Sequence, residues 1–530
     1  MLRNRPASSS DPARHSDEGL GTRLPGDIVC YNTNLSSGDR LAHGESMRKK
    51  SALLACCVAL VLGAPLARGE NLLEVYQDAV KSDPVIREAE ARRLAALEAK
   101  PQARSLLLPQ LNVGGQIYTA NQDGESTFPQ VDRTTGNIVT VGNRSSTDVS
   151  KYWDYAAELT QTVFRWDQWQ QLKRADSQVA VAEANYRAAQ QELMVRVSRA
   201  YFDVLAAEDT LSAAEATLQA FSRQLEQAEK RFEVGLIAIT DVQEARAAHD
   251  SATAGVIAAK RALASTQEVL RELTGEAYPA LVKPAEDMPL DQPQPADEQG
   301  WVDQATEQNL EVVAARLGVD VAKRDLQIAQ AGYMPTVDLF ARYGETTRDA
   351  TQTNQSFDPS GTLGAGDVVE GSADAETNSD VIGLRVNVPL FTGGGTRSKV
   401  RQQTYLHRAS REQLDGALRK AERETRDAYL GVIAERARVK ALQQSVKSNQ
   451  TALEATEAGF EVGTRTTVDV LDARRRLFEA ERDYARSRYD YLINVVRLKS
   501  AAGVLTPQDL AAINDFLTAP TTLPVVRPSP

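Results

Sequence analysis

The stretch FEVGTRTTVDVLDAR, residues 460–474, separates two long segments of helical pattern, and FEVGLIAITDVQEAR, residues 232–246, is an earlier copy of it. In each copy a glycine, Gly235 or Gly463, ends one helical pattern, and a start containing Thr and Asp follows. Glycine just past a helix end and Thr or Asp at the next helix start are typical of a helical hairpin tip. The chain is therefore predicted to contain two copies of one plan, each with a hairpin.

The segment before each tip is predicted to be one very long helix. No proline or glycine occurs between residues 167 and 233, and apolar residues recur there at intervals of seven. Such a helix would extend on the order of 100 Å at ~1.5 Å per residue, which is longer than a globular core can use. Each long helix therefore needs a partner helix, as in a coiled coil. The recurring positions are Val204, Leu211, Leu218, Leu225 and Phe232, with Val432, Val439, Val446, Leu453 and Phe460 in the second copy.

Four other segments alternate strictly between apolar and polar residues. Each has about the ~9–11 residues that a tilted membrane strand needs, and one apolar face beside one polar face is typical of an outer-membrane barrel. A half-buried strand of a soluble sheet would give the same pattern in any single segment. The polar stretches 121–150 and 346–379 are expected to be long exposed loops. The apolar positions begin with Leu111, Val113 and Ile117, Trp153, Tyr155 and Leu159, Val337, Leu339 and Ala341, and Ile382, Leu384 and Val386.

Four strands cannot close a barrel, because the smallest membrane barrels have about eight strands. Unpaired strand edges are not tolerated in lipid. Several chains must therefore contribute strands to one barrel, and the sequence predicts an obligate oligomer.

The composition excludes other classes of protein. The net charge of -11 and the pI of about 5.2 argue against nucleic-acid binding, which needs a basic patch. The cysteines are Cys30, Cys56 and Cys57, so a chain processed after residue 69 would have neither a disulfide nor a thiolate metal site.

Residues 47–69 are predicted to be a signal peptide. Basic residues follow Met47, a short apolar run follows them, and the small residues Ala67 and Gly69 favour cleavage before Glu70. A lipoprotein site at Cys56 is the weaker alternative, since almost no apolar run precedes it. Residues 1–46 are unlike a signal and are interpreted as a spurious extension, with Met47 as the true start.

The remaining chain is divided by the repeat. Residues 70–275 are expected to form the first copy, with a β-hairpin at 110–164 and a tip near residue 235. Residues 276–300 form a connector that is rich in Pro, Asp and Glu. The second copy, 301–504, is expected to contain a β-hairpin at 335–391 and a tip near residue 463. Residues 505–530 form a C-terminal segment and tail.

From residue 70 to about 512 the chain resembles the TolC family of outer-membrane efflux and secretion channels. The motifs that carry the likeness are ENLLEVYQ at 70–77, LPQL at 108–111, VGLIAITDVQ at 234–243, VGTRT at 462–466, VDVLDA at 468–473 and YLIN at 491–494. The resemblance implies an α+β membrane protein. Its outer-membrane β-barrel is shared by a homotrimer with four strands per chain, and a long antiparallel α-helical coiled-coil tunnel continues the barrel through the periplasm.

The resemblance also implies the function and the partners. The function is that of an exit duct for drug efflux, for type I protein secretion, or for both. The partners are a periplasmic adaptor protein and an inner-membrane efflux pump or ABC transporter, with outer-membrane lipid around the barrel. No cofactor is expected.

By the same resemblance, polar contacts between hairpins close a gate at the periplasmic end. Arg465 offers a planar fork of donors that suits a carboxylate such as Asp241. The family has a tyrosine at Phe460, and since phenylalanine cannot donate, we expect a less firmly latched gate. The gate residues are Thr240, Asp241, Phe460 and Arg465, with Gln224 and Glu457 as a further pair between chains.

Two further sites follow from the resemblance. Asp469 and Asp472 are three residues apart on one helix face, so three chains would place six carboxylates in a ring. Such a ring favours cations and could hold a divalent cation. The residues that would meet the adaptor are Val234, Gly235 and Leu236 on one tip, and Val462, Gly463 and Thr464 on the other.

Each of these residues also has a structural interpretation. Thr240 and Asp241 are ordinary helix N-cap residues, and Asp469 and Asp472 suit the first turn of a helix, where the dipole favours acidic side chains. Glycine at a tip suits a helix C-cap.

Two other classes of protein are alternatives to a channel. An enzyme is disfavoured, because the only histidines after residue 69 are His249 and His407, and Gly393–Gly395 lacks the spacing of a phosphate-binding loop. A cell-surface structural or adhesive coiled-coil protein would explain the heptads, but not four alternating strands of membrane length.

Overall fold

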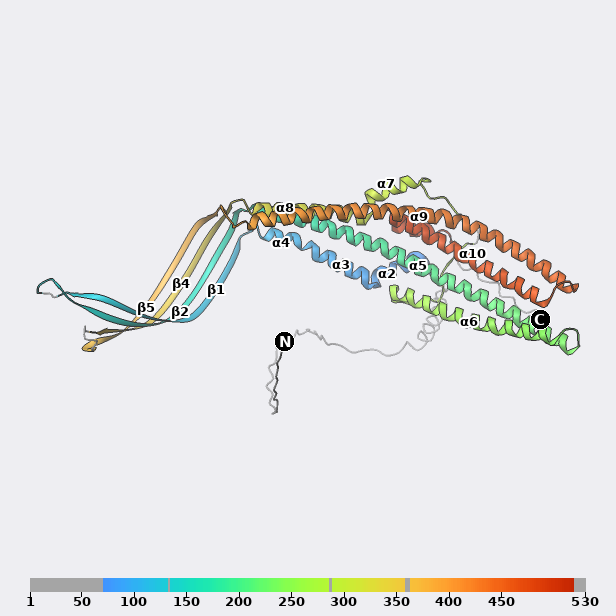
Figure 1. Ribbon diagram of the computed structural model, residues 1–530, viewed down its shortest axis with the longest axis horizontal. Coiled ribbons are helices and arrows are strands. Elements are labelled where there is room, and N and C mark those ends of the chain that lie inside the picture. Colours follow the sequence, from blue (N-terminus) through green and yellow to red (C-terminus); the bar gives the residue numbers. More distant parts are fainter. Residues whose placement is uncertain (1–69, 132–133, 286–287, 358–362, 519–530) are drawn as a thin grey trace, which may run out of the picture. The chain divides into compact units, whose positions relative to one another are not determined.

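The computed structural model describes residues 70–131, 134–285, 288–357 and 363–518 (Figure 1). The interpretations of residues 1–46 as an extension, 47–69 as a signal peptide and 519–530 as a tail lie outside these residues. The first set of elements is α2 (Leu72–Ser82), α3 (Pro84–Leu97), α4 (Ala99–Ser105), β1 (Gln110–Val131), β2 (Ile138–Phe164), α5 (Trp166–Glu233) and α6 (Ile239–Thr274).

A second set repeats this order. It comprises α7 (Glu298–Gln308), α8 (Leu310–Ala331), β4 (Thr336–Phe357), β5 (Leu363–Asn387), α9 (Gly395–Glu461) and α10 (Thr467–Ala501). Short elements outside this order are β3 (Lys283–Pro284), α11 (Pro507–Asn514) and β6 (Leu517–Thr518), and β3 pairs with β6. In the described ranges, no helix combines the length and the apolar character that crossing a membrane requires.

The four long strands form one antiparallel sheet in the order β1-β2-β4-β5. Successive residues of a strand face opposite sides of the sheet, and the register of the four strands aligns apolar residues that face the same side. Leu111, Leu159, Ala341 and Ile382 form one row across the sheet. Leu111 is 67 % exposed and Ile382 is 76 % exposed, so the single chain leaves this apolar face uncovered. The predicted four-stranded pattern is confirmed.

Most of residues 121–150 and 346–379, which were expected to be loops, are strand instead. β1 continues to Val131 and β2 starts at Ile138, while β4 continues to Phe357 and β5 starts at Leu363. Antiparallel pairing satisfies the backbone here, as between Asn121 and Val149. Alternation fails as a signal where both faces of a sheet carry polar side chains, so a polar strand was mistaken for a loop.

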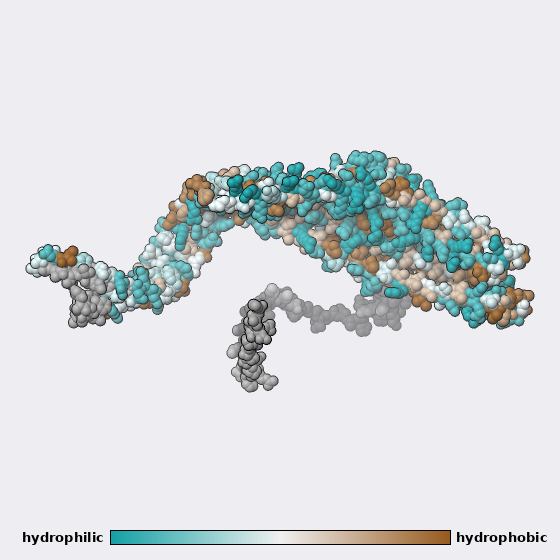
Figure 2. Space-filling model, in the orientation of Figure 1, coloured by the Kyte–Doolittle hydropathy of each residue, from teal (hydrophilic) through white to brown (hydrophobic). Residues whose placement is uncertain are grey.

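The two predicted long helices are confirmed as α5 and α9, and each joins a strand through a short link (Figure 1). Hydrophobic surface gathers where the sheet gives way to the helices (Figure 2). In that region Leu390 is 92 % exposed and Phe391 is 89 % exposed. Burial of this surface requires something outside the single chain.

The core lies midway along the long helices, where α5 packs against α2 and α10. Tyr201, Phe202 and Leu205 of α5 are fully buried, as are Val496 and Leu498 of α10. The Tyr201 hydroxyl donates to the backbone oxygen of Val282 at 2.7 Å, which fixes the connector to this core.

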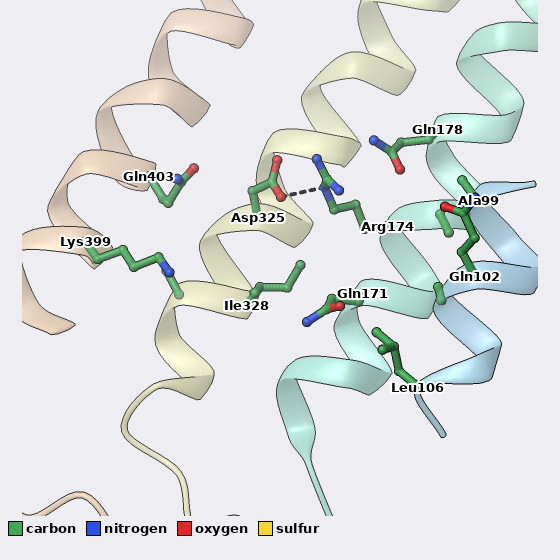
Figure 3. A pocket seen from close by; sticks show the side chains of 13 residues that line it. Ala99, Gln102, Leu106, Gln171, Arg174, Gln178, Asp325, Ile328, Lys399 and Gln403 are labelled. Atoms are coloured by element: carbon green, nitrogen blue, oxygen red, sulfur yellow. Dashed lines mark ion pairs between the residues drawn. The ribbon is translucent and has the colours of Figure 1, made fainter. Parts of the chain in front are cut away.

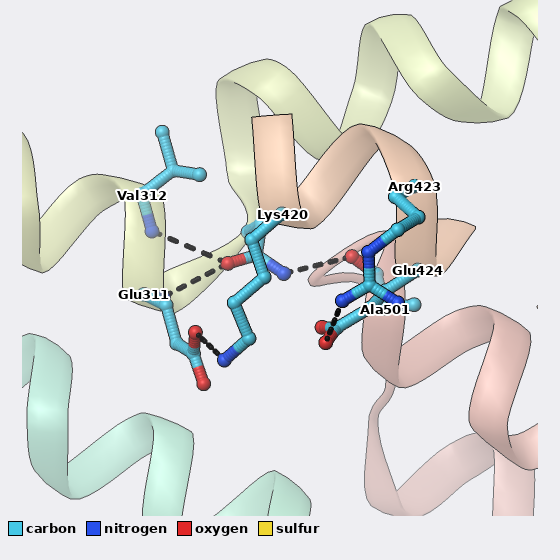
Figure 4. A network of polar contacts seen from close by, with 7 residues as sticks. Glu311, Val312, Lys420, Arg423, Glu424 and Ala501 are labelled. Atoms are coloured by element: carbon cyan, nitrogen blue, oxygen red, sulfur yellow. Dashed lines mark hydrogen bonds and ion pairs between the residues drawn. The ribbon is translucent and has the colours of Figure 1, made fainter. Parts of the chain in front are cut away.

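Capping residues separate α2 from α3 and α7 from α8. Asp83 caps α3, with Pro84 in its first turn, and the Arg196 Nη2 lies 2.6 Å from the Asp83 Oδ2. Asn309 separates α7 from α8: its Oδ1 accepts from the Glu311 and Val312 amides, and its Nδ2 donates to the Ala501 oxygen at 2.8 Å (Figure 4). These breaks let short helices bend around the core.

Gly503 provides a test of this packing, since it follows α10 at φ +77° and a Cβ there would lie 2.2 Å from the Gln308 oxygen. We expect Gly503→Ala to destabilise the protein by about 2 kcal/mol or more, through backbone strain and overpacking. Gly416→Ala is the matched control, because Gly416 lies in α9 with open space around it and should gain about 0.5–1 kcal/mol of helix stability. Thermal unfolding midpoints measure both, and equal midpoints for the two variants would contradict this account.

Candidate functional site: the hairpin tips

The two tips have the same backbone turn. Gly235 follows α5 at φ +75° and Gly463 follows α9 at φ +78°. The Leu236 amide donates to the Arg231 oxygen at 2.8 Å, and the Thr464 amide donates to the Gly459 oxygen at 2.8 Å. Glycine is needed here because few other residues adopt a positive φ without strain. The turn therefore gives both hairpins the same geometry.

The tips differ at the residue that caps the following helix. Thr466 caps α10: its amide donates to the Asp469 Oδ2 at 2.9 Å, and the Asp469 amide donates to the Thr466 Oγ1 at 3.2 Å. These bonds from the Thr466 backbone and hydroxyl hold the pKa of the Asp469 carboxyl below its ordinary value. The structural interpretation of Asp469 as a first-turn residue thus describes this chain well.

Asp241 occupies the same position at the other tip, but Ala238 caps α6 there and offers no side-chain oxygen. Thr240 and Asp241 belong to the first turn of α6 rather than to the cap itself. Within the described part of the chain, the Asp241 carboxylate accepts no hydrogen bond and has no ion-pair partner. Asp469 at the second tip is therefore engaged in the cap of its helix, while the Asp241 carboxylate at the first tip is available for another contact.

Arg465 lies over the end of α9. A Cβ added to Gly459 would come within 2.8 Å of the Arg465 Cγ, and the Arg465 amide donates to the Gly459 oxygen at 3.2 Å. Gly459 therefore makes room for the stem of Arg465, a role that the sequence did not reveal. The structure does not bring Arg465 to Asp241 in the single chain, so this pair stays a prediction for an assembled gate.

Each hairpin carries an ion pair across its two helices. The Arg246 Nη2 donates to the Glu229 Oε1 at 2.9 Å in the first hairpin, and Arg474 donates to Glu457 in the second. The two partners are 17 residues apart in both hairpins. The expected partner of Glu457 was Gln224 of another chain, but in this chain Glu457 already binds Arg474. Equal Glu–Arg spacing in the two copies was the sequence signal for these pairs.

Phe460 contacts a cation from the other hairpin. The Arg231 guanidinium carbon lies 5.0 Å from the centre of the Phe460 ring, within the usual range of a cation–π interaction. No sequence pattern predicts this contact, because heptad positions do not define which side chains meet across hairpins.

The aspartates of the expected ring have different neighbours. Asp469 is held by Thr466, whereas the Asp472 Oδ1 lies 3.4 Å from the Arg475 Nη2. In the described ranges, no group of three or more His, Cys, Asp or Glu side chains is placed to hold a metal ion within one chain. A divalent-cation site at Asp469 and Asp472 stays a prediction, and it would have to form between chains.

Open cavities lie beside the long helices. One of about 500 Å³ lies between α5, α6 and α10, on the side of the core that faces the tips. The other, of about 550 Å³, lies near the start of α5, where Arg174 points toward Asp325 of α8 with an Nε–Oδ1 distance of 2.6 Å (Figure 3). Four glutamines, Lys399, this ion pair and a few apolar side chains line the cavity, which is not an arrangement of nucleophile and base (Figure 3).

Comparisons with known proteins define the class to which this fold belongs. The family model described as "Outer membrane efflux protein" matches residues 75–276 and 301–504. Outer membrane protein TolC of Escherichia coli K12 is 36 % identical over 471 residues, which cover 88 % of this chain and 90 % of that protein. The alkaline protease secretion protein AprF of Pseudomonas aeruginosa is 28 % identical, over 84 % of this chain and 86 % of the relative.

Solved structures share the fold. The outer membrane protein VceC of Vibrio cholerae has a TM-score of 0.61 at 21 % identity, over 82 % of this chain and 96 % of that one. The outer membrane channel CmeC of Campylobacter jejuni has a TM-score of 0.61 at 17 % identity, over 84 % and 89 %.

The chain belongs to the outer membrane efflux protein family. It is thus an outer-membrane protein, and its relatives are channel and secretion proteins rather than enzymes. Nothing in these relatives supports the alternative of an adhesive coiled-coil protein.

The capping difference between the tips can be tested by hydrogen exchange. Ala238→Thr should create a hydroxyl acceptor near the Asp241 amide and slow exchange at the start of α6, while Thr466→Ala should speed exchange at the start of α10. Thr456→Ala is the control, since its hydroxyl bonds the Ala452 oxygen inside α9. Exchange rates at the tips that do not respond to either cap variant would refute the assigned geometry.

Proposed function

We propose that three copies of this chain form a channel in the outer membrane, continued by a helical tunnel through the periplasm, which serves as an exit duct for drug efflux, type I protein secretion or both. One observation carries this proposal. A four-stranded sheet with an exposed apolar face is joined directly to helices of 68 and 67 residues. At ~1.5 Å per residue, such helices extend about 100 Å.

The sheet supports the assembly. In the four-stranded sheet, β1 and β5 each have a neighbour on one side only. Unpaired backbone groups are costly in lipid, so both edges need strands from further copies. Three copies would supply twelve strands for one closed sheet, with the row that contains Leu111 and Ile382 facing lipid.

The tips are where the duct would meet its energy source. Val234, Leu236 and Val462 are 69 %, 74 % and 75 % exposed at the two tips. Exposed apolar side chains beside glycine turns suit a protein partner. We assign this contact to a periplasmic adaptor, with Gly235, Gly463 and Thr464 in the same surface, and the adaptor would connect the duct to an inner-membrane pump or ABC transporter.

The gate of the duct would lie at the same end. The free Asp241 carboxylate supports pairing of Thr240 and Asp241 with Arg465 in the trimer, and Gln224 and Glu457 would meet between chains. The proposal includes the domain division into residues 70–275, 276–300, 301–504 and 505–530. It also includes a signal peptide at residues 47–69 and a spurious extension at residues 1–46.

Conductance in a planar lipid bilayer tests the function. Purified trimers should produce discrete conductance steps, because a continuous duct leaves a water-filled path. Comparison of drug accumulation with the secreted-protein profile in a deletion strain then separates efflux from secretion. Assembled trimers without conductance, from a strain in which neither cargo changes, would overturn the proposal.

The Asp472–Arg475 contact generates a prediction about selectivity. Three copies would add three arginines to the proposed ring of Asp469 and Asp472, and these should reduce its preference for cations. We expect Arg475→Ala to raise the cation-to-anion permeability ratio about twofold and to strengthen block by divalent cations. Reversal potentials in a salt gradient measure the ratio.

Arg476→Ala is the matched control, because Arg476 is also an exposed arginine but does not pair with Asp472 in the described structure. Equal shifts in the two variants would show that only general charge matters. No shift in Arg475→Ala would remove Asp472 from the conducting path.

A further inference from the structure

We infer that Arg231 is the positioning residue that holds the two hairpins of one protomer together at their tips, through the ring of Phe460. The inference rests on the proposed function, since it assigns one part of the proposed gate. Arg231 lies on α5 and Phe460 on α9, so their 5.0 Å contact links the first hairpin to the second. Both side chains are half-buried in the single chain.

Each hairpin tip is already held together internally. Glu229 and Arg246 join α5 to α6, and Glu457 and Arg474 join α9 to α10. Together with the equivalent glycine turns, these pairs make each tip a unit. A change at the periplasmic end is therefore expected to occur between the hairpins, where fewer contacts resist it.

Aromatic stacking and a hydrogen bond join the two hairpins at the core. The rings of Phe202 and Tyr489 stack with centres 5.9 Å apart, and the Tyr489 hydroxyl donates to the Asp209 Oδ2 at 2.6 Å. Directly beyond these residues, the open cavity of about 500 Å³ lies between α5, α6 and α10. Its walls include the small residues Ala213 of α5 and Gly255 of α6.

The Arg231–Phe460 contact lies beyond this cavity. Along α5 the order is core contacts up to Asp209, cavity lining from Thr210 to Thr217, and then Arg231. From Asp209 to Arg231 the helix rises about 33 Å at ~1.5 Å per residue. A small rotation of one hairpin about the core moves its tip by a large distance, because the tip is so far from the core. A weak interaction at the tips therefore controls how far apart they lie.

The neighbouring cations do not substitute for Arg231. Lys230 pairs with Glu226 of its own helix, and Arg465 packs over Gly459 of its own hairpin. Arginine is also suited to this role, because its planar guanidinium stays charged and stacks on aromatic faces. Phe460 thereby keeps a latch even though it lacks the hydroxyl of tyrosine.

The experiment measures the distance between the tips. Spin labels on Leu236→Cys and Thr464→Cys report it by pulsed electron resonance, in trimers diluted with unlabelled chains. These would be the only cysteines after residue 57. Arg231→Met should raise the population of widely separated tips about threefold to tenfold, the range expected for loss of one cation–π contact. Closed-state conductance should rise in parallel.

Variants of the partner complete a double-mutant cycle. Phe460→Leu should have the same effect as Arg231→Met, and the double variant should have no larger effect than either single variant. Phe460→Trp should narrow the distance distribution when Arg231 is present and should not do so in Arg231→Met. Phe460→Tyr should preserve the latch and tighten it if the hydroxyl reaches Asp241. Lys230→Met is the control, because it removes the adjacent exposed charge.

The outcomes separate the two proposals. Additive effects of Arg231→Met and Phe460→Leu, or equal distances in Arg231→Met and Lys230→Met, would overturn the latch whatever the conductance. Wild-type trimers that conduct no ions would overturn the proposed function, and the distance measurement would still judge the latch. A narrower distribution of tip distances in Phe460→Trp supports the latch even if the Arg231→Met and Phe460→Leu variants fail to assemble.

Discussion

Unpaired backbone groups at the edges of β1 and β5 are the constraint on which the rest of the structure depends. A sheet that is open on both sides and apolar on one face cannot be stable in lipid as a single copy. The same requirement extends into the helices, because Leu390 and Phe391 at the junction are almost fully exposed. Helix ends near the tips are also only half covered, as at Phe232, which is 41 % exposed. The surface that a single chain leaves bare is the surface that the assembly would bury.

The repeat supplies the framework, and differences between its copies supply the site. Both tips share a glycine turn and a Glu–Arg pair across the hairpin. They differ where Ala238 stands in place of Thr466, which leaves one aspartate free and the other engaged. Substitution of a single capping residue thus separates a structural carboxylate from one that is available for contact between hairpins.

The sequence predicts the elements that local patterns define. The absence of Gly and Pro fixes the extent of α5, and the repeated glycines locate both tips. It fails for the outer halves of the strands, because a strand that is polar on both faces lacks the alternation that identifies one. It also fails for Arg231, since the contact with Phe460 depends on how two hairpins approach one another, and no local pattern encodes that approach. Gly459 and Arg475 were missed for the same reason.

The equal spacing of the Glu–Arg pairs makes the tips interchangeable modules. Residues 229–246 and 457–474 each begin with the glutamate and end with the arginine of the ion pair, and each contains the same glycine turn. An exchange of the two segments would keep the glycine turn and the ion pair of each hairpin, and it would move the free aspartate to the other hairpin. It would also replace Arg231 with glycine, so the same exchange would redistribute charge between the tips and remove the contact with Phe460.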